Sequence, residues 1–339
     1  MKKVSVVILN WNGAELLRRY LPSVCRNTCS DLADIVVADN GSDDDSLKIL
    51  REKFPEVKVI AMPVNSGFAE GYNIALKHIQ TEYVVLLNSD VEVTPGWLEP
   101  MLAYADQNPD VAAIQPKIKA CRRRTYFEHA GAAGGYIDSF GFPYCRGRIF
   151  DCVEEDRGQY DTIKDVFWAT GACLFTRTRD YEAAGGLDPL FFAHMEEIDL
   201  CWRFHRLGKR VVCVPEGVVY HLGGATLDTE NPRKTYLNFR NNLLMLHKNL
   251  PPEKRSKIIL QRKLLDGIAA LNFLLHGKGK NFTAVLNAHA DAKRMIRSYY
   301  TPLKNESRPE VISLLPGNNS SIVFDYYMKG KKRFSDLLK

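Results

Sequence analysis

Four apolar segments, each followed by a segment with helical spacing, most constrain the fold of this chain. The apolar segments are typical of strands with their side chains buried on both faces, and they cover residues 4–9, 34–42, 57–62 and 83–88. The segments that follow them have apolar residues at helical spacing, and they cover residues 13–24, 44–54, 65–79 and 95–107. Strand and helix therefore alternate four times, which predicts a parallel α/β sheet covered by helices.

Polar residues gather where the predicted strands end. They are Asn10, Asn12, Asp39, Asn40, Asn65, Asn88 and Asp90. Ligands of open parallel sheets bind outside the carboxyl ends of the strands, so we expect these side chains to line one shared cleft. The first strand runs into NWNGAELL, which has one glycine and lacks the GxGxxG pattern. A dinucleotide cofactor is therefore not expected, and no Walker loop is found.

The charge is divided unevenly along the chain. Residues 231–339 carry 21 Lys and Arg against 7 Asp and Glu, a net charge of +14, whereas residues 1–230 carry 25 against 33, a net charge of −8. We expect two parts, an acidic catalytic domain over 1–230 and a basic helical extension over 231–339. The extension would meet an anionic partner, either a membrane surface, a phosphorylated lipid or nucleic acid.

A membrane surface is favoured over nucleic acid, because no nucleic-acid-binding module is found. Residues 257–275 have apolar residues at helical spacing flanked by cations, so they either lie along a membrane interface or pack on the catalytic domain. The apolar run 4–9 is too short for a signal peptide, and no apolar window of about 18 residues exists. Eight cysteines without CxxC spacing are expected to be free thiols. We therefore expect a cytoplasmic protein with peripheral contact to the membrane.

An ordered series of motifs resembles the family-2 glycosyltransferases, and more narrowly their rhamnosyltransferase-like branch. The motifs are ILNWNG, VVADNGSDD, NSGFAEGYNIAL, LLNSDVEV, GGLDPLFFAHMEEIDLCWRFHRLGKRV and VYHLGG. The resemblance covers roughly residues 3–250. It implies a GT-A fold, with a Rossmann-like, mostly parallel sheet and a C-terminal helical extension. It also implies an inverting hexosyltransferase that moves a sugar from a nucleotide-diphosphate sugar, TDP-rhamnose being the best-known donor of the branch. The acceptor would be a hydroxyl of a saccharide or lipid-linked molecule in cell-surface polysaccharide synthesis.

The resemblance places the nucleotide-sugar contacts at the polar strand ends: Asn10, Asp39, Asn65, Gly67, Asn88 and Asp90. A carboxylate at Asp39 suits hydrogen bonds from the base or ribose, although DNGS is also a common turn sequence. Gly67 would allow the backbone to approach the ligand closely, or it is simply part of the loop before a helix.

The same resemblance implies a divalent metal, Mg²⁺ or Mn²⁺, on the diphosphate. The usual DxD motif reads Asn88-Ser89-Asp90 here, so Asp90 is the expected ligand. Hard cations of this kind take oxygen ligands. His221 is the expected second ligand. The alternative for Asp90 is a cap on the turn before Thr94.

Glu197 lies at the position of the family's catalytic base, where Asp is usual, and Glu196 would bind acceptor hydroxyls. An inverting transfer needs such a base within reach of the acceptor hydroxyl. Asp199 lies two residues further on and is expected to pair with Arg203.

Two residues outside this motif have two interpretations each. Trp168 offers a flat apolar face to the acceptor, or it is a core residue. Arg240 would reach a diphosphate on a lipid acceptor, or it packs against the domain.

Two other functions are considered beside glycosyl transfer. A sugar nucleotidyltransferase would share the sheet and the metal, but it usually has a Gly-rich signature with a basic residue near the first strand, which NWNGAE lacks. A catalytically decayed sugar-binding or scaffold protein is the other alternative, because Glu197 replaces an Asp and Asn88 replaces the first DxD carboxylate.

Overall fold

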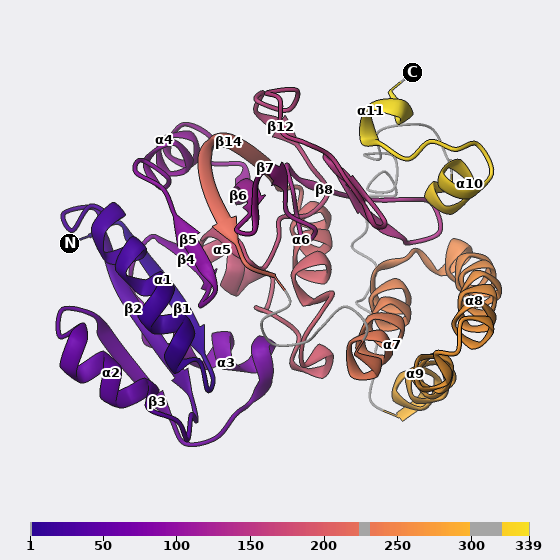
Figure 1. The fold of residues 1–339 in the computed structure, drawn as a ribbon, viewed down its shortest axis with the longest axis horizontal. Helices are drawn as coiled ribbons and strands as arrows, with labels where there is room; N and C mark the ends of the chain where they lie inside the picture. The colour runs from indigo at the N-terminus through magenta and orange to yellow at the C-terminus, as the bar shows by residue number, and fades with distance from the viewer. Residues whose placement is uncertain (1, 224–230, 299–320, 339) are drawn as a thin grey trace.

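A ten-stranded sheet crosses the centre of the molecule. The computed structural model describes residues 2–223, 231–298 and 321–338. Along the sheet the strands follow the order β12-β14-β6-β13-β4-β1-β2-β3, with β5 paired to β14 and β7 to β6 (Figure 1). The α/β fold class with C-terminal helices that the sequence predicts is confirmed.

The first half of the sheet is parallel and has helices on both faces. Its strands are β1 (Val4–Asn10), β2 (Ala33–Asn40), β3 (Lys58–Met62) and β4 (Tyr83–Asn88), and its helices are α1 (Ala14–Asn27), α2 (Ser46–Lys53) and α3 (Gly67–Leu76). In β1, Val4, Val6 and Ile8 face one apolar cluster, whereas Val7 faces the other. Alternate side chains of a strand point to opposite faces, so burial of both faces explains the uninterrupted apolar run.

The second half of the sheet mixes strand directions. Its elements are β5 (Val91–Val93), α4 (Glu99–Gln107), β6 (Val111–Ala120), β7 (Arg123–Phe127), β12 (Lys164–Asp165), β13 (Cys173–Arg177) and β14 (Arg210–His221). Strand β13 lies antiparallel between β4 and β6, and β14 lies parallel to β6 and antiparallel to β5. A separate four-stranded sheet contains β8 (Gly135–Ile137), β9 (Pro143–Cys145), β10 (Arg148–Ile149) and β11 (Cys152–Val153).

The remaining helices are α5 (Thr178–Ala183), the 3₁₀ helix η1 (Pro189–Phe191), α6 (Glu196–Arg206), α7 (Pro232–Asn249), α8 (Pro252–Leu275), α9 (Gly279–Ser298), α10 (Ile322–Tyr327) and α11 (Phe334–Leu337). Of these, α7 to α11 lie on the side of the molecule away from β3, as Figure 1 shows. No helix in the described ranges is both long and apolar enough to cross a bilayer. All eight cysteines are free, as predicted.

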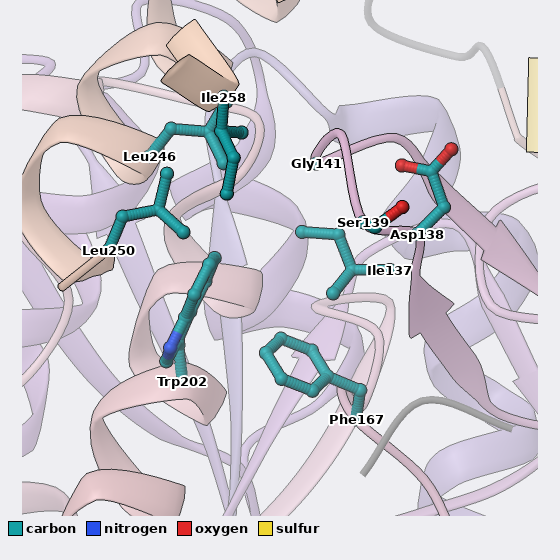
Figure 2. A pocket seen from close by; sticks show the side chains of 9 residues that line it. All are labelled: Ile137, Asp138, Ser139, Gly141, Phe167, Trp202, Leu246, Leu250 and Ile258. Atoms are coloured by element: carbon teal, nitrogen blue, oxygen red, sulfur yellow. The ribbon is translucent and has the colours of Figure 1, made fainter. Parts of the chain in front are cut away.

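The C-terminal helices share an apolar core with the elements that precede them in the chain. Figure 2 shows Trp202 of α6 and Phe167 close to Leu246, Leu250 and Ile258 from α7, α8 and the turn between them. The space left among these side chains is about 10 Å³, room for roughly one water. The helices after residue 231 are therefore packed tightly onto the rest of the molecule.

Candidate active site

The strand ends bring predicted site residues together at one edge of the sheet. In the register of the sheet Asn10 lies beside Asp39, and Leu9 lies beside Asn88. Asn10 Nδ2 donates to Asp39 Oδ2 at 3.0 Å. The other Asp39 oxygen accepts from the Ser42 backbone N–H at 2.9 Å, so this carboxylate also holds the DNGS turn. Both sequence interpretations of Asp39 are therefore compatible with its position.

Asn65 and Gly67 form the loop that enters α3. Asn65 Oδ1 accepts from the Gly67 N–H at 2.8 Å and from Asn40 Nδ2 at 3.1 Å. Gly67 has a φ of +83°, and a Cβ there would lie 2.6 Å from the Phe192 ring. The space that Gly67 leaves is therefore filled by Phe192 of the same chain, which is a different reason for glycine from the close approach of a ligand.

Asp90 and His221 come together because the strands that follow and precede them pair. β5 and β14 are antiparallel, with Val91 opposite His221. This register places Asp90 Oδ1 3.1 Å from His221 Nε2, and both side chains are buried. Asn88 Nδ2 lies 3.5 Å from the same His221 nitrogen, at the limit of hydrogen-bond distance.

Glu128, which the sequence analysis did not identify, lies behind His221. Its Oε2 is 3.3 Å from His221 Nδ1, close enough for ionic attraction although the contact lacks good hydrogen-bond geometry. Glu128 Oε2 also accepts from the Ala130 N–H at 2.5 Å. Burial alone would lower the pKa of His221, but the carboxylates of Asp90 and Glu128 outweigh burial and raise it to about 10.

These residues fit a divalent cation bound together with a diphosphate. When the imidazole is neutral and carries its proton on Nδ1, its Nε2 lone pair and Asp90 Oδ1 lie side by side as two possible metal ligands. Glu128 favours that tautomer, as carboxylates commonly do behind metal-binding histidines. No group of three or more His, Cys, Asp or Glu side chains suited to a metal occurs within the described ranges. A site with two protein ligands suits Mg²⁺, which usually keeps waters and substrate phosphates as further ligands.

Glu196 and Glu197 begin α6 and reach the same region from the other side. The backbone carbonyl of Ala172 accepts from the Asn88 N–H at 3.0 Å. A Cβ on neighbouring Gly171 would lie 3.8 Å from Glu197 Cβ, so the end of β4 and the start of α6 meet at this segment. Oε2 of each glutamate is buried without a hydrogen-bond partner in the described part of the chain, which leaves unsatisfied acceptors for a ligand.

Burial shifts both glutamates toward the protonated form. It raises the pKa of Glu197 to about 7. Burial, followed by the charge of Glu197, raises the pKa of Glu196 well above its ordinary value. Glu197 is the more exposed of the two. A carboxyl group with a pKa near neutrality is suited to accept a proton and release it again.

The loop before α6 is held in an unusual backbone conformation. Phe192, His194 and Met195 have φ values of +65°, +71° and +73°, which are uncommon for residues with side chains. Asn241 Nδ2 of α7 lies 2.9, 2.8 and 2.7 Å from the carbonyl oxygens of Phe191, Ala193 and His194. On the other side, the Phe68 N–H donates to the Phe192 carbonyl at 2.8 Å. These contacts fix the start of α6.

Arg240 also binds this loop. Its Nη2 donates to the carbonyl oxygens of Leu190 and Phe191 at 3.1 and 2.9 Å. This is the packing alternative of the sequence analysis, and the structure gives Arg240 no separate contact that prepares it for a lipid diphosphate.

Trp168 and Asp199 are both structural residues in this fold. Trp168 is 3% exposed and its indole N–H donates to the Tyr136 carbonyl at 2.9 Å, so it has no open ring face for an acceptor sugar. The core alternative describes it better. Asp199 is fully buried and lies 2.8 Å from Arg203 Nη2, which confirms the predicted pair. Burial would raise the pKa of Asp199, but Arg203 and Lys248 outweigh it and lower the pKa.

Comparison with known proteins agrees with this geometry. The family model described as glycosyl transferase family 2 matches residues 5–162. The N-acetylglucosaminyl-diphospho-decaprenol L-rhamnosyltransferase of Mycobacterium tuberculosis is 25% identical over 231 residues, which are 64% of this chain and 75% of that protein. The O-antigen biosynthesis protein RfbC of Myxococcus xanthus is 26% identical over 65% of this chain, but the match spans only 17% of RfbC.

A solved structure extends the likeness to the fold. GalNAc-T7, crystallised with UDP, GalNAc and Mn²⁺, has a TM-score of 0.61 and 16% identity, over 88% of this chain and 58% of that one. The sheet has the GT-A fold of this structure, and the fold expected from the sequence is confirmed. Residues 5–162 thus match the family-2 glycosyltransferase model, and the chain is similar to a rhamnosyltransferase.

Proposed function

We propose that this chain catalyses inverting transfer of a sugar from a nucleotide-diphosphate sugar to a hydroxyl of a saccharide or lipid-linked acceptor. The observation that carries the proposal is the Asp90–His221 pair, with its 3.1 Å contact at the carboxyl edge of the sheet. Asn10, Asp39, Asn65, Gly67 and Asn88 would bind the donor along that edge. Donor binding there agrees with the general position of ligands in open α/β sheets.

Asp90 and His221 would hold Mg²⁺ or Mn²⁺. The bound cation would neutralise charge on the departing diphosphate. Asp90 contributes the hard oxygen ligand, and Glu128 keeps the imidazole turned so that Nε2 faces Asp90. GalNAc-T7 was solved with Mn²⁺, so manganese is the first ion to test.

Glu197 would accept the proton of the acceptor hydroxyl. Its Oε2 has no hydrogen-bond partner among the residues that the structure describes, and its raised pKa allows it to take up a proton near neutral pH. Glu196 would accept a hydrogen bond from a neighbouring acceptor hydroxyl through its own unpartnered oxygen. The extra methylene of Glu relative to Asp is accommodated beside Gly171, which has no side chain.

The donor and acceptor are proposed by similarity. The M. tuberculosis relative is named as a rhamnosyltransferase of a diphospho-decaprenol acceptor, so TDP-rhamnose and a polyprenyl diphosphate-linked sugar are the first pair to test. An acceptor of that class is anchored in a bilayer. The basic extension of residues 231–339 would accordingly bring the catalytic domain to the cytoplasmic face of the membrane.

A donor-hydrolysis screen tests the function. Release of nucleotide is measured from TDP-rhamnose and a set of UDP- and GDP-sugars, with Mn²⁺ or Mg²⁺, for the wild type, Asp90→Ala and Glu197→Gln. The wild type should release nucleotide from at least one donor, Asp90→Ala should lose release, and Glu197→Gln should keep donor affinity while transfer to acceptor falls at least 100-fold.

Glu216→Gln is the matched control, because Glu216 is exposed on β14 and is not part of the site. It should behave as the wild type. If the wild type and Asp90→Ala alike release nucleotide from no donor, the enzyme proposal fails and a decayed sugar-binding protein becomes the better description.

A further inference from the structure

Helix α8 buries the polar residues Arg262 and Asp266 and exposes a row of large apolar side chains. Arg262 and Asp266 are 5% and 1% exposed, and they form an ion pair of 2.7 Å on the inner face of the helix. Arg262 also donates to the carbonyl of Gly141 and to Asn242 Oδ1, and Asp266 contacts His289 of α9 at 3.0 Å. A surface helix of a soluble domain ordinarily has the opposite arrangement.

The outer face of α8 is a row of large apolar side chains. Between 49% and 83% of each of these residues is exposed: Leu260, Leu264, Ile268, Leu271, Leu274 and Leu275. Their spacing of three and four residues places them on one side of the helix. Six of the seventeen exposed large apolar residues in the described ranges lie on this one helix. Figure 1 shows α8 at the outer edge of the molecule, far from β1–β3.

The charges around this row are cationic. Lys254, Lys257 and Lys263 of α8 are exposed, and Lys280 follows at the start of α9. Helix α8 has two carboxylates: Asp266, which is buried and paired, and Glu253, which is exposed in the first turn. Three exposed lysines against one exposed carboxylate leave the border of the apolar row positively charged, which is complementary to an anionic lipid surface.

We propose that the outer face of α8 binds an anionic lipid bilayer, with the helix lying in the plane of the interface. This deepens the proposed function, because it rests on an acceptor anchored in that bilayer. The leucines and the isoleucine would enter the acyl region, while Lys254, Lys257 and Lys263 would contact the headgroup phosphates. The ion pair on the inner face keeps α8 on α7 and α9, so the helix can bind without leaving the domain.

A second copy of the chain is the less suitable occupant of this face. A symmetric dimer through α8 would bring the same surface patch of two copies together. Each copy would bring the exposed Lys254, Lys257 and Lys263 to the contact against one exposed carboxylate of α8, Glu253, so the two patches would repel each other.

Vesicle flotation of the full chain tests the proposal. Vesicles of phosphatidylcholine alone are compared with vesicles that also contain phosphatidylglycerol, whose surface is negatively charged. The wild type should float with the anionic vesicles and release at high salt. The variant L264S/I268S/L271S should bind at least tenfold more weakly, and K254Q/K257Q/K263Q should lose the preference for anionic lipid.

Two controls keep the test decisive. Leu207→Ser removes an exposed leucine at the end of α6 and should bind as the wild type. Melting curves should be unchanged in all variants, because only exposed side chains are altered. Hydrolysis of the nucleotide-sugar donor in solution should also be the same in all variants. If the wild type hydrolyses no donor, the proposed enzyme function fails, but the flotation result still stands.

Three results would overturn the proposal. The first is a wild type that does not float with either vesicle. The second is equal flotation of the wild type and the leucine variant. The third is a wild type of twice the monomer mass by light scattering that becomes monomeric in the leucine variant, because a second copy would then be the occupant.

Discussion

At the scale of single residues, the site combines two buried clusters with different electrostatic character. Asp90, His221 and Glu128 form a charged group in which each member has an ionic contact. Glu196 and Glu197 form a carboxyl pair with unpartnered oxygens. The first arrangement suits a cation, and the second suits proton transfer. Their different surroundings allow nearby carboxylates to perform different tasks.

The pH dependence of sugar transfer should follow the protonation of the Glu197 carboxyl group. A base must be deprotonated to act, and burial raises the pKa of Glu197 to about 7. The rate should therefore rise with pH through about 7 in the wild type, measured as kcat/KM for the acceptor at saturating donor. Glu216→Gln should keep this profile. A rate that is flat between pH 5.5 and 8.5 would argue against Glu197 as the base.

Thermal stability provides a readout of Glu197 that does not depend on activity. A carboxyl whose folded pKa is raised favours the folded state at low pH, and this contribution is lost as pH rises through about 7. Glu197→Gln removes the cost of a buried charge. The variant should melt a few degrees above the wild type at pH 8, and the difference should shrink at pH 5. A variant less stable than the wild type at pH 8 would contradict the burial argument.

Glu128 should affect the affinity for the cation more than the fold. Glu128→Gln keeps the size of the side chain but weakens the attraction for the Nδ1 proton of His221. Loss of such an outer carboxylate typically weakens metal binding about 10–100-fold. Titration of Mn²⁺ by electron paramagnetic resonance would measure this directly. Glu92→Gln, whose partner Arg124 lies at the surface, is the matched control. Equal Mn²⁺ affinity in Glu128→Gln and wild type would exclude the role.

At the scale of elements, α7 serves the active site through one side chain. Asn241 is fully buried, and its amide nitrogen lies within 2.9 Å of three carbonyl oxygens in the loop before α6. The three positive φ values of that loop are unfavourable unless neighbouring groups hold them. The direction of Glu197 therefore depends on a helix that begins 35 residues later in the chain.

Asn241→Asp replaces the amide donor with an acceptor that faces carbonyl oxygens. The loop should relax, so kcat should fall at least tenfold while the KM for the donor changes little. The apparent pKa of the pH profile should also move from about 7, which a purely global loss of stability would not cause. Asn287→Asp on α9, whose side chain is exposed, should have neither effect. An unchanged pH profile in Asn241→Asp would show that α7 does not position Glu197.

Sequence patterns predicted the regular elements well and the irregular ones poorly. The predicted strand 83–88 coincides with β4, and the predicted helix 65–79 contains α3 (Gly67–Leu76). Two-residue strands such as β10 have no periodicity to detect. Trp168 was ambiguous for a related reason. The apolar sequence around it is the same whether its ring packs in the core or contacts a ligand.

The candidate site divides in the same way. The sequence predicted Asp90 and His221 as site residues because Asp90 follows a strand and His221 ends one, each within a recognisable motif. Glu128 and Asn241 were not assigned these roles, because each contact depends on tertiary packing between residues separated by 47 or more positions. Neither residue has a local pattern that could have signalled its contacts.

At the scale of the whole molecule, a buried ionic network joins the two parts that the sequence predicts. Asp199 of α6 contacts Arg203 at 2.8 Å, Lys248 of α7 at 2.8 Å and Asn249 at 2.7 Å. The extension thus supplies charges that the catalytic part needs in order to bury Asp199. Residues 1–230 are a recognisable unit of sequence, but their interior is completed by later helices.

Asp199→Asn should strongly destabilise the protein. It leaves the cations of Arg203 and Lys248 buried without their shared carboxylate, and breaking a buried pair in this way typically costs about 3–5 kcal/mol. Chemical denaturation would measure the loss in the free energy of unfolding. Asp165→Asn breaks an exposed pair with Arg210 and should cost no more than about 1 kcal/mol. Equal losses in the two variants would show that the network contributes nothing specific.

The position of β13 has a consequence for how the protein is synthesised. This strand separates β4 from β6 in the sheet, although both precede it in the chain. A nascent polypeptide that ends at residue 162, the limit of the family-model match, would therefore have an open edge on β4 and a detached β6. Such an edge invites pairing with other chains. The edge of β4 is covered only when residues 173–177 are available to pair with it.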